Sequence, residues 1–200
     1  MDVAAFLVAL CLGLGLSAAS GFRIFIPPLA MSLAAHSGMV TLSPDWQWVG
    51  SYPAMITLGA ATAIEVLAYF VPWVSNGLDA IEVFAAPVAG TLLTASSLSM
   101  VGDLNPVLVW TVAAVAGGGT AEIVEGATSV TRLVASSVSG GLGGPVVSTG
   151  EMLSATVLSL LAILVPVVAF GVVVFLLVYS GHRIRKWWRR RNRPQKRPGL

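Results

Sequence analysis

Long apolar runs make up most of the chain, and short stretches holding Pro, Gly, Trp or a charge separate them. Because about 20 apolar residues cross a bilayer as a helix, these runs predict transmembrane helices. We therefore predict an all-α fold, a polytopic transmembrane helical bundle with about six or seven hydrophobic segments, some of them broken or re-entrant. The segments are 3–19, 22–38, 54–74, 77–99, 106–118, 120–139 and 151–180.

Only the segments 54–74 and 151–180 look like plain spanning helices. Pro27-Pro28 interrupts the second segment, and the three glycines 117–119 end the fifth segment, where they weaken a helix and permit a break or a tight bend before the sixth. Such breaks are tolerated at membrane depth where protein or a wet cavity covers the freed backbone groups. The pattern therefore allows either six or seven crossings, or fewer crossings with one or two re-entrant hairpins. The glycine-rich stretch 140–150 is expected to be a flexible linker.

Two pairs of stretches resemble each other along the chain. AYFVPWV (68–74) matches AILVPVV (162–168), and residues 13–23 and 117–132 both run from glycines through small residues to an arginine. An internal repeat of this kind, if inverted, is typical of transporters with a midplane site between broken helices. Chance matches are also expected in a chain so rich in Ala, Val, Leu and Gly, and the pattern does not decide between the two.

The composition excludes an ordinary soluble domain. Hydrophobic residues make up 56% and charged residues 10% of the 200 residues, and the mean hydropathy is +0.87, whereas soluble domains carry roughly 25% charged residues. We predict a single transmembrane domain over residues 1–180 and a basic, disordered tail over residues 181–200. Asp2 stands where a signal peptide would be positive, which favours a retained first helix over a cleaved leader.

The charge is unevenly distributed between these two parts. Residues 1–180 hold all nine acidic residues and only Arg23 and Arg132 as basic ones, and residues 181–200 hold nine Lys or Arg and no acid. The positive-inside rule predicts a cytoplasmic C-terminus, and the tail is expected to bind anionic lipid headgroups. Because the tail directly follows a spanning segment, this role is favoured over binding of nucleic acid.

Seven charged residues lie in or at the ends of apolar segments. Each would cost about 2.5–3.5 kcal/mol or more at the bilayer centre if it faced lipid unpaired. The two arginines can pair with only two of the five carboxylates, so the others need a proton, a cation or water. These residues are the candidate site for substrate or ion binding: Arg23, Glu65, Asp79, Glu82, Glu122, Glu125 and Arg132.

The spacing of these residues also allows structural roles. Glu122, Glu125 and Arg132 share one helix face, which suits a transport site or an ion-pair network that fixes helix register. Asp79 and Glu82 follow the start of a helix, where acids favour the helix dipole and meet water. Two further acids, Asp103 and Glu151, adjoin turns and are expected to be solvated caps.

No motif of an enzyme is present. The chain lacks a P-loop, a dinucleotide fingerprint, a zinc motif and a GxSxG elbow, and Cys11, its only cysteine, excludes a disulfide within one chain. We expect no catalytic activity, no cofactor and no metal. The first hypothesis is a transporter or channel-like permease for an unknown small solute or ion, possible as a homo-oligomer because a bundle of 20.7 kDa has little interior. The alternative is a non-transporting membrane scaffold or lipid-remodelling protein.

Three stretches carry a resemblance to a known family. They are GLSAASGFRIFIPPLAMSLAA, EVLAYFVPWVSNGLDAIEVFAAPVAGTLL and GATSVTRLVASSVSGGLGGPVVSTGE, and they cover most of residues 13–151. In this order they resemble a widespread bacterial membrane family catalogued as domain of unknown function 4126. The resemblance implies a small polytopic protein of the bacterial inner membrane, and it implies no particular activity.

Overall fold

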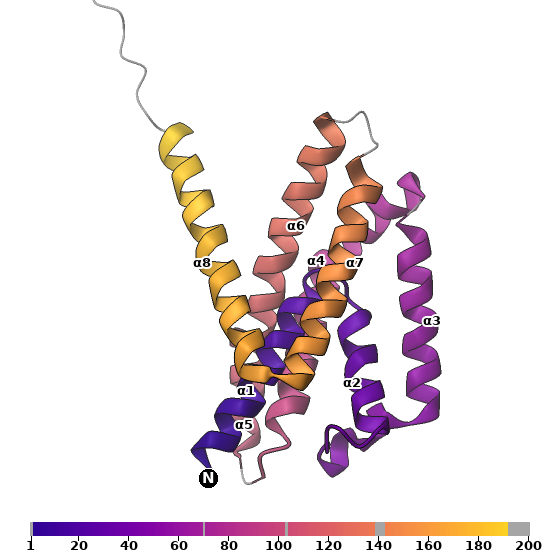
Figure 1. Ribbon diagram of the computed structural model, residues 1–200, viewed down its shortest axis with the longest axis vertical. Coiled ribbons are helices and arrows are strands. Elements are labelled where there is room, and N and C mark those ends of the chain that lie inside the picture. Colours follow the sequence, from indigo (N-terminus) through magenta and orange to yellow (C-terminus); the bar gives the residue numbers. More distant parts are fainter. Residues whose placement is uncertain (1, 70, 103, 139–142, 192–200) are drawn as a thin grey trace, which may run out of the picture.

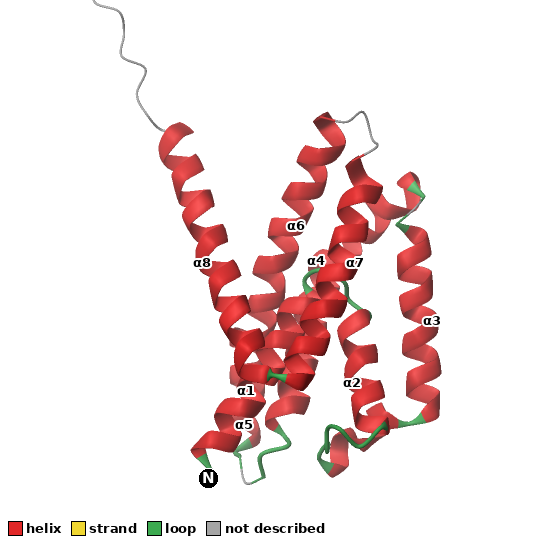
Figure 2. Ribbon diagram, in the orientation of Figure 1, coloured by secondary structure: helices red, strands yellow, loops and turns green. Residues whose placement is uncertain are grey.

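The computed structural model describes residues 2–69, 71–102, 104–138 and 143–191, without the side chains of residues 72–73, 75–76, 79 and 179–191. All regular structure in these ranges is helical (Figure 2), which confirms the predicted all-α class. The elements follow in the order α1 (Val3–Ser20), α2 (Ile26–His36), η1 (Pro44–Gly50), α3 (Tyr52–Ala68), α4 (Pro72–Leu98), α5 (Pro106–Val112), η2 (Ala113–Gly118), α6 (Gly119–Val138), α7 (Gly143–Leu164) and α8 (Pro166–Arg191).

Within the described residues, four helical stretches are long and apolar enough to cross a membrane. They are α1, the part of α4 over Ala80–Leu98, the continuous helix Pro106–Val138, and α7. A fifth is possible if η1 and α3, which meet at an angle of 57°, form one bent span. The chain therefore has the helices of a multi-pass membrane protein, while the predicted count of six or seven segments is not confirmed.

The predicted break at residues 117–119 is wrong. Pro106 begins a helix that Asn105 caps by accepting the Val107 amide at 2.8 Å, and this helix continues to Val138 through one π-helical stretch, η2. The glycines instead allow this helix to cross α4 closely, because a Cβ atom at Gly117 would lie 2.7 Å from the carbonyl oxygen of Gly90 in α4. Segments five and six are therefore one helix.

The predicted last segment, residues 151–180, is two helices. The chain breaks at Val165, and Pro166 begins α8, since proline lacks an N–H and suits the first turn of a helix. Helices α7 and α8 run in opposite directions (Figure 1). The expected linker 140–150 is also wrong over its described part, because α7 already begins at Gly143.

Helix α1 lies at the centre of the bundle and packs against α4, α7 and α8. Its second half is fully covered, with Leu16 at the middle of the largest apolar cluster. The Ser17 hydroxyl donates to the carbonyl oxygen of Gly90 in α4 at 2.7 Å, as expected where small residues let helices approach closely.

Helices α3 and α8 stand at opposite edges of the bundle (Figure 1). The only buried residue of α3 is Glu65, whereas its apolar side chains Ile56 and Ile64 are 70% and 67% exposed. The predicted internal repeat is not confirmed by this arrangement, because Arg23 lies in the turn after α1 and Arg132 lies within a continuous helix.

The crossing of η2 and α4 gives a stability prediction. Gly117→Ala should lower the free energy of unfolding by about 1–3 kcal/mol, because the added methyl group overpacks the contact with α4. Gly126→Ala on the following helix is the matched control, since a Cβ atom there meets nothing within 4 Å, and it should be neutral or stabilising. Unfolding in detergent, followed by circular dichroism, compares the two, and equal stabilities would contradict the close crossing.

Candidate functional site

An ion pair between α6 and α7 forms the middle of the site. Nη2 of Arg132 lies 3.1 Å from Oε2 of Glu151. Nε and Nη2 of Arg132 also donate to Oε1 of the same carboxylate at 3.3 and 3.2 Å. Both side chains are buried. This two-point contact between a guanidinium and a carboxylate is the strong form of such a pair.

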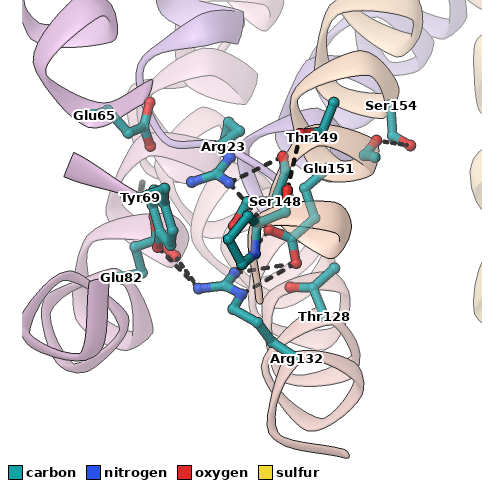
Figure 3. A network of polar contacts seen from close by, with 12 residues as sticks. Arg23, Glu65, Tyr69, Glu82, Thr128, Arg132, Ser148, Thr149, Glu151 and Ser154 are labelled. Atoms are coloured by element: carbon teal, nitrogen blue, oxygen red, sulfur yellow. Dashed lines mark hydrogen bonds and ion pairs between the residues drawn. The ribbon is translucent and has the colours of Figure 1, made fainter. Parts of the chain in front are cut away.

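Arg23 joins the same carboxylate from the turn between α1 and α2. Its Nη2 lies 3.3 Å from Oε2 of Glu151 and donates to the carbonyl oxygen of Ser148 at 3.1 Å. Glu151 therefore lies between the only two arginines of residues 1–180 (Figure 3). It holds together the α1–α2 turn, α6 and α7.

Tyr69 and Glu82 also contact the arginines. The Cζ atom of Arg23 lies 3.6 Å from the centroid of the Tyr69 ring, and Nη1 of Arg132 donates to the Tyr69 hydroxyl at 2.9 Å. Oε2 of Glu82, on α4, lies 3.6 Å from the same Nη1. A cation over a desolvated aromatic ring contributes about 2 kcal/mol, so Tyr69 stabilises the buried positive charges.

Glu65 binds the backbone at the start of α2. Its Oε1 accepts the Ile24 amide at 2.8 Å and its Oε2 accepts the Phe25 amide at 3.3 Å. The first N–H groups of a helix have no partner within the helix, and the helix dipole favours a negative charge there. This contact fastens α3 to α2.

Two members of this arrangement keep unused hydrogen-bonding atoms. Nε and Nη1 of Arg23 and Oε1 of Glu82 are buried and have no hydrogen-bond partner among the described residues, and the two residues are only 1% and 3% exposed. A buried polar atom without a partner costs about 1–3 kcal/mol, and more when it is charged. These atoms are therefore available to water, an ion or a ligand.

We call the six residues Arg23, Glu65, Tyr69, Glu82, Arg132 and Glu151 the central cluster. Two guanidinium groups face three carboxylates in it. The imbalance that the sequence predicts is therefore retained within the folded protein, and a proton, a cation or water has to compensate for it. The described residues contain no group of three or more His, Cys, Asp or Glu arranged to hold a metal ion.

The structure brings four predicted site residues into the central cluster: Arg23, Glu65, Glu82 and Arg132. Glu125 is buried on α6 and accepts the Ser129 hydroxyl at 2.5 Å. Glu122 is exposed, and the described part of the chain gives it no ion pair. Glu122 is therefore separated from the buried groups with which the helical spacing places it on one face. The side chain of Asp79 lies outside the described residues.

The expectation of a solvated cap at Glu151 is wrong. Glu151 is 4% exposed and lies in the third turn of α7, because residues 143–150 are helical and carry it inward. The signal for this placement is a stripe of buried, mostly small residues at helical spacing that includes Glu151: Ser148, Glu151, Ala155, Ser159 and Ala162. No comparable pattern marks Tyr69, and Asp103 lies outside the described residues.

The contacts of Glu151 predict a large loss of stability when its charge is removed. Glu151→Gln should lower the free energy of unfolding by about 3–5 kcal/mol, because two buried guanidinium groups lose their shared partner. The matched control Glu122→Gln replaces an exposed carboxylate and should change the free energy by less than about 0.5 kcal/mol. Titration with dodecyl sulfate measures both, and a tolerated Glu151→Gln would show that the ion pairs contribute little.

A second prediction concerns the attachment of α3. Glu65→Ala removes the only buried side chain of α3, so amide hydrogen exchange in α3 should accelerate while exchange in α1 stays slow. Ile64→Ala, one residue away on the exposed face, is the control and should leave exchange unchanged. Equal protection of α3 in both variants would mean that other contacts hold this helix.

Comparison with known proteins gives one match. Residues 10–186 match the family described as Domain of unknown function (DUF4126). No curated protein and no solved structure matches the chain. The match covers most of the helical bundle and every residue of the central cluster, in agreement with the resemblance of the three quoted stretches. The chain belongs to the DUF4126 family.

Proposed function

We propose that this protein is a small membrane transporter or channel-like permease whose central cluster binds the transported solute or ion. The observation that carries the proposal is the set of unpartnered buried atoms, Nε and Nη1 of Arg23 and Oε1 of Glu82. They belong to oppositely charged groups on either side of Tyr69 (Figure 3). Such a site offers both donors and an acceptor to a ligand that enters it.

The alternative is a scaffold or lipid-remodelling protein whose buried charges are structural. The contacts of Glu151 favour it, because this one carboxylate connects the α1–α2 turn with α6 and α7. A structural network, however, gains nothing from leaving charged atoms unpaired, and each of them costs about 1–3 kcal/mol or more. The unpartnered atoms of Arg23 and Glu82 therefore support a binding role.

The arrangement of α2 and α3 agrees with transport. Helix α2 has eleven residues, about 16 Å at the rise of an α-helix, which is too short to cross a bilayer. We interpret α1 and α2 as a hairpin in which α2 is re-entrant and its N-terminus lies at membrane depth beside Glu65. Interrupted helices whose N-termini point at the site are a common feature of transporters.

A proton cycle follows from the charges of the central cluster. Three carboxylates face two guanidinium groups, so a proton on Glu82 would bring the cluster to electrical balance. Loss of that proton would leave Oε1 of Glu82 as an unpaired acceptor that attracts a cation or a donor group. Binding of a ligand would therefore change the proton occupancy of Glu82: a cation would replace the proton, whereas an anion would bind together with it. Arg132, bound to both Glu82 and Glu151, would follow the change.

The setting of the protein is part of the same proposal. We place it in the bacterial inner membrane with a cytoplasmic C-terminus, because the nine basic residues of 181–200 lie in the last turns of α8 and directly after it. The basic tail would bind anionic lipid headgroups there. Exposed apolar side chains on the outer faces of the bundle would contact lipid or another copy of the chain in a homo-oligomer.

Flux through proteoliposomes tests the proposal. Wild-type protein should accelerate the decay of a proton, sodium or chloride gradient above that of empty liposomes. Glu82→Gln should slow this decay about tenfold, which corresponds to the loss of about 1.4 kcal/mol of stabilisation at one step. Glu122→Gln, the exposed control, should match the wild type within about twofold.

Two results would contradict the proposal in this test. One is wild-type flux equal to that of empty liposomes for all three ions. The other is equal flux in wild type and Glu82→Gln, which would show that the central cluster does not take part. Glu82→Gln is suited to the comparison because it keeps the shape of the side chain, and circular dichroism of the reconstituted variants confirms that they are folded.

A further inference from the structure

A large apolar groove opens between α4 and the pair α2 and α3. Its volume is about 1240 Å³, above the roughly 300–1,000 Å³ of pockets that hold drug-sized ligands. Phe25, Leu58 and Val88 are among the side chains that line it. The groove exists because α3 stands away from the bundle and buries only Glu65 (Figure 1).

The groove lies beside the central cluster at two stretches of chain, although none of the six cluster residues lines it. Ile24, directly after Arg23, lines the groove, and its amide is held by Glu65. On α4, Ile81 and Ala85 line it on either side of Glu82. The residues that carry the unpartnered polar atoms are therefore neighbours of the residues that form the apolar wall.

We propose that the groove and the central cluster together bind an amphiphilic carboxylate from the bilayer, with its chain in the groove and its carboxylate on Arg23. The inference rests on the proposed transport function and names its substrate class. Nε and Nη1 of Arg23 carry three N–H groups that have no acceptor in the described part of the chain, and a guanidinium matches a carboxylate in shape and charge. The apolar walls supply the binding energy for the chain.

The charge balance requires a proton to accompany this ligand. A carboxylate added to the central cluster would make four acidic groups against two guanidinium groups. A proton on Oε1 of Glu82, which has no hydrogen-bond partner among the described residues, restores part of the balance and turns this oxygen into a donor. The ligand therefore binds together with a proton, more tightly at acidic than at alkaline pH.

We expect the ligand to come from the bilayer, because the walls of the groove are apolar and exposed apolar side chains lie beside them on the outer surface of the bundle. Ile56 and Ile64 on α3 and Phe84 on α4 are 67–76% exposed. A ligand diffusing in the membrane would enter sideways between α3 and α4. Movement of α3, held to α2 by Glu65, would then open the way from the groove to Arg23.

Tryptophan fluorescence measures this binding directly. Trp46 and Trp110 line the groove, so 9,10-dibromostearate added to the purified protein in detergent should quench them saturably. The methyl ester of the same acid should bind at least about tenfold more weakly, since it cannot form the charged contact with Arg23, a difference of about 1.4 kcal/mol. Excess acetate should not displace the acid, because it lacks the chain.

Variants separate the groove from the carboxylate contact. Thr57→Phe with Val88→Phe fills the groove from two exposed positions and should weaken binding of the acid about tenfold. Ile56→Phe with Val83→Phe is the matched control, with exposed positions on the same two helices that do not line the groove. Arg23→Gln should reduce the affinity for the acid to that for the ester, and if this variant does not fold, the ester on wild-type protein tests the same contact.

Three outcomes would overturn the inference: no saturable quenching, equal affinity for acid and ester, or displacement of the acid by acetate. Equal affinities for the acid and the ester would mean that apolar chains occupy the groove without a specific contact to the carboxylate. The result of this binding experiment is independent of the result of the flux experiment. Ion flux without binding of the acid would reject the substrate class alone, and binding of the acid without protein-dependent movement of the acid and its proton across proteoliposomes would reject transport alone.

Discussion

The structure depends on how two guanidinium groups are kept inside a membrane bundle. A charge facing lipid at the bilayer centre is costly, and Glu151 removes this cost for Arg23 and Arg132 together. The three residues come from the α1–α2 turn, α6 and α7, so this one carboxylate fixes the relative positions of three parts of the chain. Tyr69 adds an aromatic surface for the guanidinium of Arg23 and a hydroxyl for that of Arg132.

Small residues make this arrangement possible. The backbone of η2 approaches α4 closely at Gly117 and Gly90, and Ser17 bonds to the Gly90 carbonyl from α1. Close contacts of this kind hold α1, α4 and the long helix Pro106–Val138 together by dispersion and hydrogen bonds, because lipid offers no hydrophobic driving force between helices. Helix α3 lacks such contacts, and the apolar groove between α3 and α4 is the consequence.

The proposed function connects these two features. The rigid side of the protein carries Arg23, Arg132 and Glu151, and the loosely attached side carries Glu65 on α3. A ligand that binds the unpartnered atoms of Arg23 would contact the side that carries Glu151. The access of the ligand to Arg23 would depend on the position of α3. Glu82, the residue proposed to bind a proton, lies between the two, because it is on α4, which borders both the central cluster and the groove.

The class of the protein and much of its chemistry follow from the amino-acid pattern alone. Apolar runs predict membrane helices because a bilayer of fixed thickness requires them, and the family follows from three recognisable stretches. A charge within an apolar run has few explanations, and this identifies four candidate site residues that the structure brings together: Arg23, Glu65, Glu82 and Arg132. The surplus of carboxylates over arginines was visible as well, since it depends only on counting.

Only the tertiary structure decided how helices end and which charges meet. The glycines 117–119 suit a break or a close crossing equally well, and the approach of α4 decides for the crossing. Glu151 adjoins a glycine-rich stretch that resembles a linker, and its burial follows from packing of α7 against α2 and α6. Glu122 and Glu125 lie three residues apart, yet one is exposed and the other buried. Helical spacing gives the direction of a side chain, but only the neighbouring helix determines what that side chain meets.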